Sequence, residues 1–297
     1  MFSKKEIWRI AMEQSARDLN CDPEDFLKPT PVVASGGGGL SAEAKKYYKA
    51  PIPMNFVSYG SNVVVSALEG YKDIAAEYIH TFEFYRCFET PAIHWLDERL
   101  APFQQKVCFM AEYQLPDPEK VRPLPCAYPL KVLEQKDFSG LYLPEWHNAL
   151  CEDRKELDVL GVGAYDGEAL IGLAGCSADA EMMWQIGVDV LPEYRGQGIA
   201  AALTSRLALE ILERNKVPFY CSAWSNLLSV RNALRCGFTP AWVEMTVKPE
   251  IVINEMQTYS GWQQEYYDAM KRGDFTHGAS DYAKTHPSLK EKQNIEL

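Results

Sequence analysis

The feature that most constrains the fold is the stretch VDVLPEYRGQGIAAALTSRLALEIL, residues 188–212. It opens with strand-forming residues, Pro192 ends the pairing, and two glycines at 196 and 198 precede a long amphipathic run. Apolar residues recur every four positions along that run: Ile199, Leu203, Leu207 and Ile211. This is the spacing of one helix face, so the stretch predicts a strand, a tight turn and a helix that packs on a sheet.

The turn before this helix has the chemistry of an anion site. Glycines at 196 and 198 leave backbone amides uncovered where the helix begins, and the helix dipole adds positive potential there. Arg195 adds a permanent charge with a geometry that suits phosphate oxygens. The pattern therefore predicts a pyrophosphate site. A helix start that merely contains helpful glycines is the alternative.

The second half of the chain alternates strands and helices. We expect a strand, a turn and a short helix in residues 130–143, a helix continuing over 148–160, and a hairpin over 159–178 that turns at Asp166-Gly167. The following segments are predicted as strand 182–191, helix 198–215, strand 217–224, helix 227–236 and strand 238–247. This order predicts a three-layer α/β domain.

The first half is also mixed, with a helix expected over 3–19, strands within 55–68 and 106–115, and helices over 69–82 and 94–103. Four glycines at 36–39 invite a phosphate-loop interpretation, but no Gly-Lys-Ser/Thr follows them, so a surface loop or hinge is expected. Five prolines between 116 and 129 mark the expected domain boundary. We divide the chain into residues 1–122, 123–249 and a C-terminal helical extension or tail, 250–297.

Composition limits the function classes. The 297 residues carry a net charge of −11, which disfavours nucleic acid or an anionic membrane as partner. Eight scattered cysteines without a Cys-x-x-Cys pair, and no secretory segment at the start, predict reduced thiols in the cytoplasm. The histidines lack metal-ligand spacing and no apolar run is long enough to span a membrane, so we expect neither a metal site nor a membrane partner.

The segment Arg-Gly-Gln-Gly-Ile-Ala, residues 195–200, resembles the Arg/Gln-x-x-Gly-x-Gly/Ala signature of GNAT N-acetyltransferases. The segment SNLLSVRNALRCGF, residues 225–238, is similar to the family's Asn-x-x-Ala/Ser stretch. The order of elements also matches, and the resemblance covers about residues 126–248. It implies a GNAT-like three-layer domain with a central mixed sheet over 123–249, preceded by a smaller mixed α/β accessory domain.

The resemblance implies acetyl-CoA as co-substrate, no metal, and a cleft between splayed strands. The strand before the signature would pair with the pantetheine arm, and the signature would bind the pyrophosphate. The implied cofactor-binding residues are Val188, Asp189, Val190, Arg195, Gly196, Gln197, Gly198, Ile199, Ala200, Asn226 and Ser229. Asn226 has the alternative role of capping the next helix. Trp184 and Trp224 would line the substrate cleft or pack in the core.

The catalytic positions depart from the family pattern. The usual tyrosine position is Ala233, and the usual base positions are Ile186 and Trp184. Three explanations stay open: catalysis mainly by positioning, another group near the cleft, or a base from the first domain. Glu181 acting through a water is the catalytic candidate, and Tyr220 and Cys221 are further possibilities on the next strand. The candidates from the first domain are His80, His94, Glu83, Glu89 and Glu112.

The resemblance therefore predicts an acetyl-CoA-dependent N-acetyltransferase that acts on a small amine. A non-catalytic acyl-CoA sensor and an enzyme acting on a protein amine are the alternatives. The sequence leaves the acceptor and the oligomeric state open.

Overall fold

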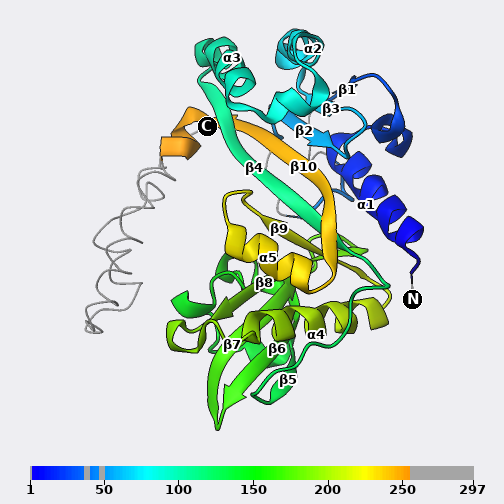
Figure 1. Ribbon diagram of the computed structural model, residues 1–297. Helices are drawn as coiled ribbons and strands as arrows, with labels where there is room; N and C mark the ends of the chain where they lie inside the picture. Colours follow the sequence, from blue (N-terminus) through cyan, green and yellow to red (C-terminus); the bar gives the residue numbers. More distant parts are fainter. Residues whose placement is uncertain (1, 37–40, 47–50, 255–297) are drawn as a thin grey trace.

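The protein is described here by a computed structural model that covers residues 2–36, 41–46 and 51–254 (Figure 1). The accessory helix expected beyond residue 254 and three of the four consecutive glycines, 37–39, lie outside the described residues.

From β6 to β10 the described chain follows the order expected from the sequence, whereas strand β1 was not expected. The main helices are α1 (Lys4–Leu19), α2 (Lys72–Thr81), α3 (Thr90–Leu100), α4 (Ile199–Glu213) and α5 (Leu227–Arg235). The strands are β1 (Val32–Ser35), β2 (Met54–Ser58), β3 (Val64–Ala67), β4 (Gln105–Pro116), β5 (Leu130–Glu134), β6 (Asp158–Asp166), β7 (Ala169–Ser177), β8 (Met183–Val190), β9 (Val217–Ser222) and β10 (Phe238–Pro249). The hairpin of β6 and β7 turns at Asp166-Gly167 as expected, with Gly167 at a φ of 59°.

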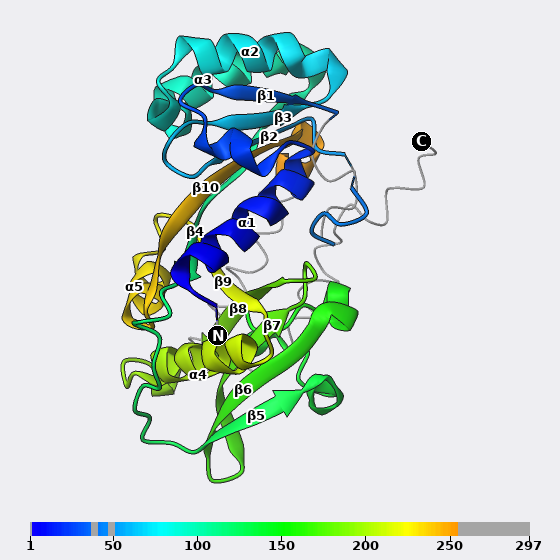
Figure 2. The same ribbon diagram turned by 90° about the vertical axis from the view of Figure 1, so that its right-hand side faces the viewer.

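One mixed sheet of ten strands runs through the described residues, in the order β1-β3-β2-β10-β4-β9-β8-β7-β6-β5. The long strands β4 and β10 pair along their whole length and cross from the upper to the lower part of the molecule (Figures 1 and 2). Strand β10 also pairs with β2 near the start of the chain. Sheet pairing therefore crosses the predicted division at residues 122 and 123, which remains a prediction.

The N-terminal segments have a core of their own. Helices α2 and α3 bury Tyr78, Leu96 and Leu100 in one cluster with Phe56 of β2 and Met245 of β10. Strand β10, from the second half of the chain, forms one side of this core. The two halves of the sequence are consequently built around shared strands rather than around separate sheets.

A buried ion pair attaches the segment 41–46 to α1. Lys45 Nζ lies 2.5 Å from Asp18 Oδ2, and both side chains are at most 2% exposed. Burial raises the pKa of Asp18 while the Lys45 ammonium opposes that shift. The backbone N–H of Lys46 donates to the carbonyl of Asp179, in the turn between β7 and β8. The segment thus joins the N-terminal helix to the lower part of the sheet.

The two faces of the lower sheet carry different layers. Gly172 of β7 and Val190 of β8 lie under α4, where Ile199 and Leu203 pack on them. On the opposite face the backbone of 148–149 lies directly on the cross-strand pair Gly175 and Gly187. A Cβ on either glycine would overlap a backbone carbonyl of that segment. The glycine pair therefore allows residues 146–150 to lie against the sheet.

The helix predicted over 148–160 is wrong. The structure has a short 3-10 segment, Glu152–Leu157, that is interrupted at Arg154 (φ −144°, ψ 41°), and β6 begins at Asp158. The backbone N–H of Cys151 donates to Asp158, and Arg154 pairs with Asp179 at 2.7 Å. These hydrogen bonds to side chains replace the helical backbone hydrogen bonds that the local pattern favoured.

Gly187→Ala is expected to lower the free energy of unfolding by about 3 kcal/mol, because its methyl group would displace the backbone at Asn148. Urea denaturation of both proteins measures the difference. Gly70→Ala is the matched control, since a Cβ there meets nothing within 4 Å. Equal unfolding midpoints for Gly187→Ala and the wild type would show that the segment does not rest on this glycine.

Candidate functional site

The site begins where two parallel strands separate. Strands β8 and β9 pair from Met183↔Val217 to Ile186↔Tyr220 and no further. Beyond Ile186, β8 continues to Val190 with β7 on one edge only. The splayed strands expected from the sequence are therefore present, and the other edge of β8 is free over its last residues.

Strand β9 leaves β8 because it joins β4. Its last residues pair with β4 at Tyr220↔Gln114, Cys221↔Tyr113 and Ser222↔Glu112. Tyr220 thus belongs to both ladders, with Ile186 on one side and Gln114 on the other. We call the opening between β8 and β9 beyond this residue the fork.

Backbone groups line the free edge of β8. Leu191 N–H donates to Ile171 of β7, and backbone groups in an antiparallel pair alternate between the two edges. The N–H and C=O of Val188 and Val190 therefore face the fork, whereas those of Asp189 face β7. The carbonyl of Val190 accepts from Arg195 Nε at 2.9 Å. Both groups of Val188 and the N–H of Val190 are left to pair with an extended ligand.

The glycine turn continues from the end of β8 into α4. Gly196 and Gly198 have φ values of 79° and 83°, which residues with a side chain rarely adopt. Gly198 caps α4 without a side-chain hydrogen bond, and the first turn of the helix contains no acidic residue. The uncapped amides of this turn and the positive end of the helix dipole therefore favour an anion near the end of β8.

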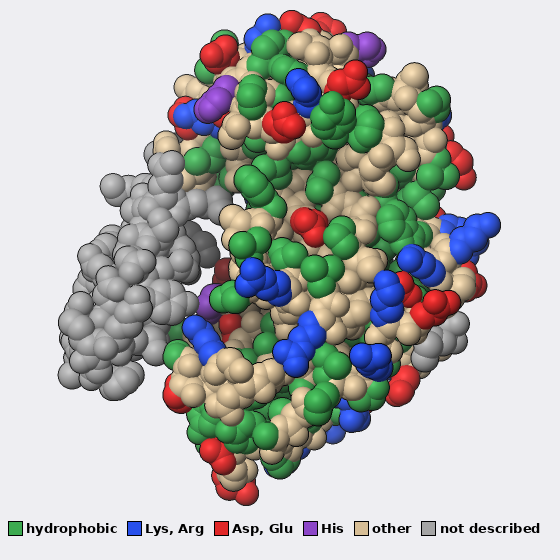
Figure 3. All heavy atoms as spheres, viewed as in Figure 1, with side chains coloured by type: hydrophobic (Ala, Val, Ile, Leu, Met, Phe, Trp, Pro, Cys, Tyr) green, Lys and Arg blue, Asp and Glu red, His purple; other side chains and the backbone are tan. Residues whose placement is uncertain are grey.

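Two arginines approach this turn. Arg195 is exposed and held against β8 by its bond to Val190. Arg235, near the end of α5, has its Nη2 3.7 Å from the position that a Cβ on Gly198 would occupy. The sequence pattern missed Arg235, because nothing local links α5 to the glycine turn. Lys and Arg side chains gather on the face that carries α4 and α5 (Figure 3), so an anion is favoured there despite the negative net charge.

Tyrosines brace the turn from outside. Tyr128 donates from its hydroxyl to Gln197 Oε1 at 3.1 Å, and Tyr194 donates to Asp166 at 3.1 Å. The two tyrosine rings meet edge to face at 5.7 Å. Tyr128 lies in the proline-rich stretch and was not singled out in the sequence. The hydrogen bond from Tyr128 therefore helps to fix the Gln197 side chain within the turn.

Asp189 holds the segment 146–150 on the sheet. Its carboxylate accepts from the backbone N–H of Asn148 (2.8 Å) and Ala149 (2.9 Å) and from Asn148 Nδ2 (2.6 Å). With its backbone facing β7 and its side chain holding this segment, Asp189 shapes the wall of the fork. Its implied role of pairing with a cofactor stays a prediction.

Helix α5 forms the other wall. Asn226 caps this helix by accepting from Ser229 N–H at 3.2 Å, which is the capping role considered above, and its cofactor role is untested. Ser229 Oγ lies 3.0 Å from the Tyr220 hydroxyl. Ala233, at the usual tyrosine position, is fully buried.

Of the five candidate bases from the first domain, the sheet brings Glu112 next to the fork. Glu112 pairs directly with Ser222 of β9, and the buried Gln114 donates to its carboxylate at 2.9 Å. The other four candidates lie on α2, on α3 or on the 3-10 segment between these helices: His80, His94, Glu83 and Glu89. Burial raises the pKa of Cys221 to about 12, so this thiol is a poor nucleophile.

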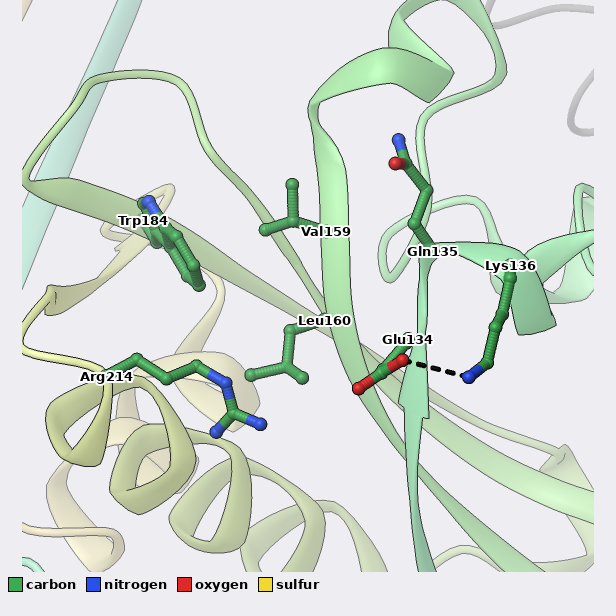
Figure 4. Close-up of a pocket in the computed structure, with 7 residues that line it drawn as sticks. All are labelled: Glu134, Gln135, Lys136, Val159, Leu160, Trp184 and Arg214. Atoms are coloured by element: carbon green, nitrogen blue, oxygen red, sulfur yellow. Dashed lines mark ion pairs between the residues drawn. The ribbon is translucent and has the colours of Figure 1, made fainter.

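The structure does not bring Glu181 or Trp184 to the fork. Glu181 precedes β8, at its far end, and is exposed. Trp184 pairs with Pro218 in the closed part of the ladder. Its ring points into a pocket of about 270 Å³ that is also lined by Leu160 and Arg214 (Figure 4). Trp224 lies just beyond the last residue of β9 and is 65% exposed.

Further features of the described residues bear on the function classes. The eight cysteines, all within the described residues, form no disulfide bond with one another. Within residues 2–36, 41–46 and 51–254 no three His, Cys, Asp or Glu side chains are grouped so that they could hold a metal ion. In the same part of the chain no helix combines the length and hydropathy needed to cross a membrane.

Residues 96–241, from α3 to β10, match the family described as GNAT acetyltransferase. This region of the chain, just under half of its length, is similar to the GNAT acetyltransferase family, whose members use acetyl-CoA. The match begins in α3, before the predicted boundary at residue 123. No curated protein matches the chain.

Similar solved structures carry the same family description. A GNAT-family acetyltransferase from Novosphingobium aromaticivorans is 21% identical, with a TM-score of 0.37, over 48% of this chain and 66% of that one. A GCN5-related N-acetyltransferase-like protein from Streptococcus suis is 20% identical, with a TM-score of 0.40, over 52% and 67%. An acetyltransferase from Salmonella typhimurium, solved with its cofactor acetyl-CoA, is 15% identical, with a TM-score of 0.33, over 42% and 95%. The chain spans about two thirds of the length of the first two.

Asp189→Asn is expected to loosen the segment 146–150, because an amide has one acceptor oxygen where the carboxylate accepts three hydrogen bonds. The expected loss is about 2 kcal/mol in the free energy of unfolding, with faster hydrogen exchange at the amides of Asn148 and Ala149. Glu193→Gln removes the same charge from an exposed position nearby and should change neither. Unchanged exchange in Asp189→Asn would contradict the assignment.

Proposed function

We propose that the protein is an acetyl-CoA-dependent N-acetyltransferase that moves the acetyl group to a primary amine of a small molecule. The observation that carries this proposal is the fork, which has an anion-binding turn at its open end. One edge of β8 offers free backbone groups, and the amides of the α4 start lie at the end of that edge. An extended ligand with a terminal pyrophosphate, such as acetyl-CoA, fits this order of groups.

In this proposal the pyrophosphate lies on the turn 195–200, with Arg195 and Arg235 beside it. The pantetheine arm pairs with Val188 and Val190 on the free edge of β8. A backbone N–H of this edge polarises the thioester carbonyl while the neutral amine attacks its carbon. The fork holds the two reactants in line, and such positioning is worth up to about 7–11 kcal/mol in well-aligned cases.

Two features support an amine as acceptor. The Glu112 carboxylate is fixed by Gln114 beside β9, and it suits a cationic substrate or the proton that the amine gives up. Trp224 is exposed after the end of β9, where an aromatic face can contact an organic cation. Both residues belong to the proposal. A cytoplasmic location is part of it as well and agrees with cysteines that form no disulfide bond with one another.

Calorimetric titration with acetyl-CoA and CoA tests the cofactor site. The wild type should bind both ligands, and Arg195→Ala and Arg235→Ala should each weaken binding roughly 10-fold or more, because each removes a charge-assisted contact. Arg206→Ala is the matched control, since this arginine lies on the same helix α4 and pairs with Glu210. A wild type that binds neither ligand would overturn the proposal.

Release of free CoA thiol over a panel of amines tests the reaction itself. Turnover with a diamine, amino acid or amino sugar supports the N-acetyltransferase. Tight binding with no turnover over the whole panel would instead favour an acyl-CoA sensor, and turnover with peptides alone would favour a protein amine as the acceptor.

A further inference from the structure

Tyr220 occupies the closed end of the fork. Its backbone is the last residue paired with β8 and the first position at which β9 pairs with β4. Its side chain is 4% exposed and reaches toward α5, where the hydroxyl lies 3.0 Å from Ser229 Oγ. Asn232, one turn further along α5, also hydrogen-bonds to this phenol. The hydroxyl is therefore held between the strand that closes the fork and the helix that forms its wall.

A ligand that follows the free edge of β8 from the glycine turn ends at the backbone pair of Ile186 and Tyr220. From the glycine turn the edge runs back past Val190 and Val188 to Ile186, where the opening closes. Phosphates on the turn would place the other end of an extended arm beside Tyr220. In the proposed reaction that end is the thioester, and its cleavage expels a sulfur that needs a proton.

The other titratable groups around this position are engaged elsewhere, and the buried Cys236 thiol donates to the carbonyl of Ala201. The Asp189 carboxylate holds the backbone of residues 148–149 on the opposite face of the sheet. Cys221, the next residue on β9, points away from Tyr220 and bonds with Tyr113. Glu112 lies one strand further away and is bound by Gln114. The Tyr220 phenol is thus the group at the closed end of the fork that can supply a proton.

We propose that Tyr220 is the catalytic acid that protonates the departing sulfur, an inference that rests on the proposed function. The amine nitrogen bonds to the carbonyl carbon, the carbon–sulfur bond breaks, and the sulfur takes the phenolic proton. The proton that the new amide nitrogen loses returns to Tyr220 through solvent. The products are an amide and free CoA thiol, and the phenol is regenerated.

The surroundings of the phenol suit a donor. Burial raises the pKa of Tyr220, while the hydrogen bonds with Ser229 and Asn232 oppose that shift. The raised pKa keeps Tyr220 protonated at neutral pH, and the hydrogen bonds with Ser229 and Asn232 favour the phenolate that forms when the proton leaves. The two partners on α5 also fix the direction of the hydroxyl.

Tyr220→Phe keeps the ring and removes the proton. With the amine that the wild type turns over fastest, we expect kcat to fall about 10²-fold and the Kd of acetyl-CoA, measured by calorimetry, to stay within twofold. Tyr165→Phe, on β6 away from the fork, is the matched control and should retain wild-type values.

A second measurement uses CoA alone and needs no acceptor. A phenol that donates to the sulfur stabilises the thiolate. Removing it in Tyr220→Phe should therefore raise the pKa of the bound CoA thiol by about one, which is followed by thiolate absorbance. Should that variant fail to bind CoA, 3-fluorotyrosine at position 220 keeps the hydroxyl, makes it more acidic, and should lower the thiol pKa instead.

The outcomes separate the two proposals. A wild type that does not bind acetyl-CoA overturns the proposed function and this inference with it. Binding together with an unchanged kcat or an unchanged thiol pKa in Tyr220→Phe overturns the role of Tyr220 alone. A lower kcat with the higher thiol pKa supports it.

Discussion

The whole site depends on the point at which β9 changes partner. Tyr220 hydrogen-bonds into the β8 ladder on one side and the β4 ladder on the other, and after it β9 stays with β4. Strand β4 is itself fixed by β10, which pairs with it from Phe238↔Pro116 to Pro249↔Gln105. The fork is therefore not determined by β8 and β9 alone. It exists because β9 leaves β8 to pair with β4, which is itself paired with β10. Strand β4 comes from the first half of the chain.

This dependence explains why the site reaches beyond the family signature. The signature contains the glycine turn, and the turn alone makes an anion site by exposing amides at the α4 start. The opening that a ligand arm would enter requires β4, and the charge beside the turn requires Arg235 from α5. Interactions between exposed charges are largely screened beyond about 8 Å at physiological ionic strength. A net charge of −11 consequently says little about a turn that has arginines within contact distance.

Much of the fold could be predicted from local signals. The 159–178 hairpin follows from its Asp-Gly turn, and α4 follows from its four-residue period and the glycines before it. The resemblance to GNAT enzymes predicted the splayed strands as well. These features depend on neighbouring residues or on a motif, so they can be read from a single sequence.

The remainder depends on residues that are distant in sequence. The 148–160 segment has apolar residues that a helix could use, yet Asp158, Asp179 and Asp189 hold it in an irregular path from positions outside the segment or at its end. A sequence pattern contains no record of those partners. The same limit applies to β10, whose pairing with β2 joins residues almost two hundred positions apart in one sheet. Proline density indicated a boundary in the chain but could not show which strands cross it.

The positions that depart from the family pattern make sense in this arrangement. Ala233 has no hydroxyl and is fully buried, so the α5 position at which the family pattern has a tyrosine supplies no acid here. Ile186 and Trp184 lie in the closed part of the ladder, and their backbones are used to pair with β9. Polar groups near the fork come instead from β9 and β4, at Tyr220, Ser222 and Glu112. The strands that open the fork also carry its titratable side chains, so the same pairing sets the geometry of the opening and the proton chemistry proposed for it.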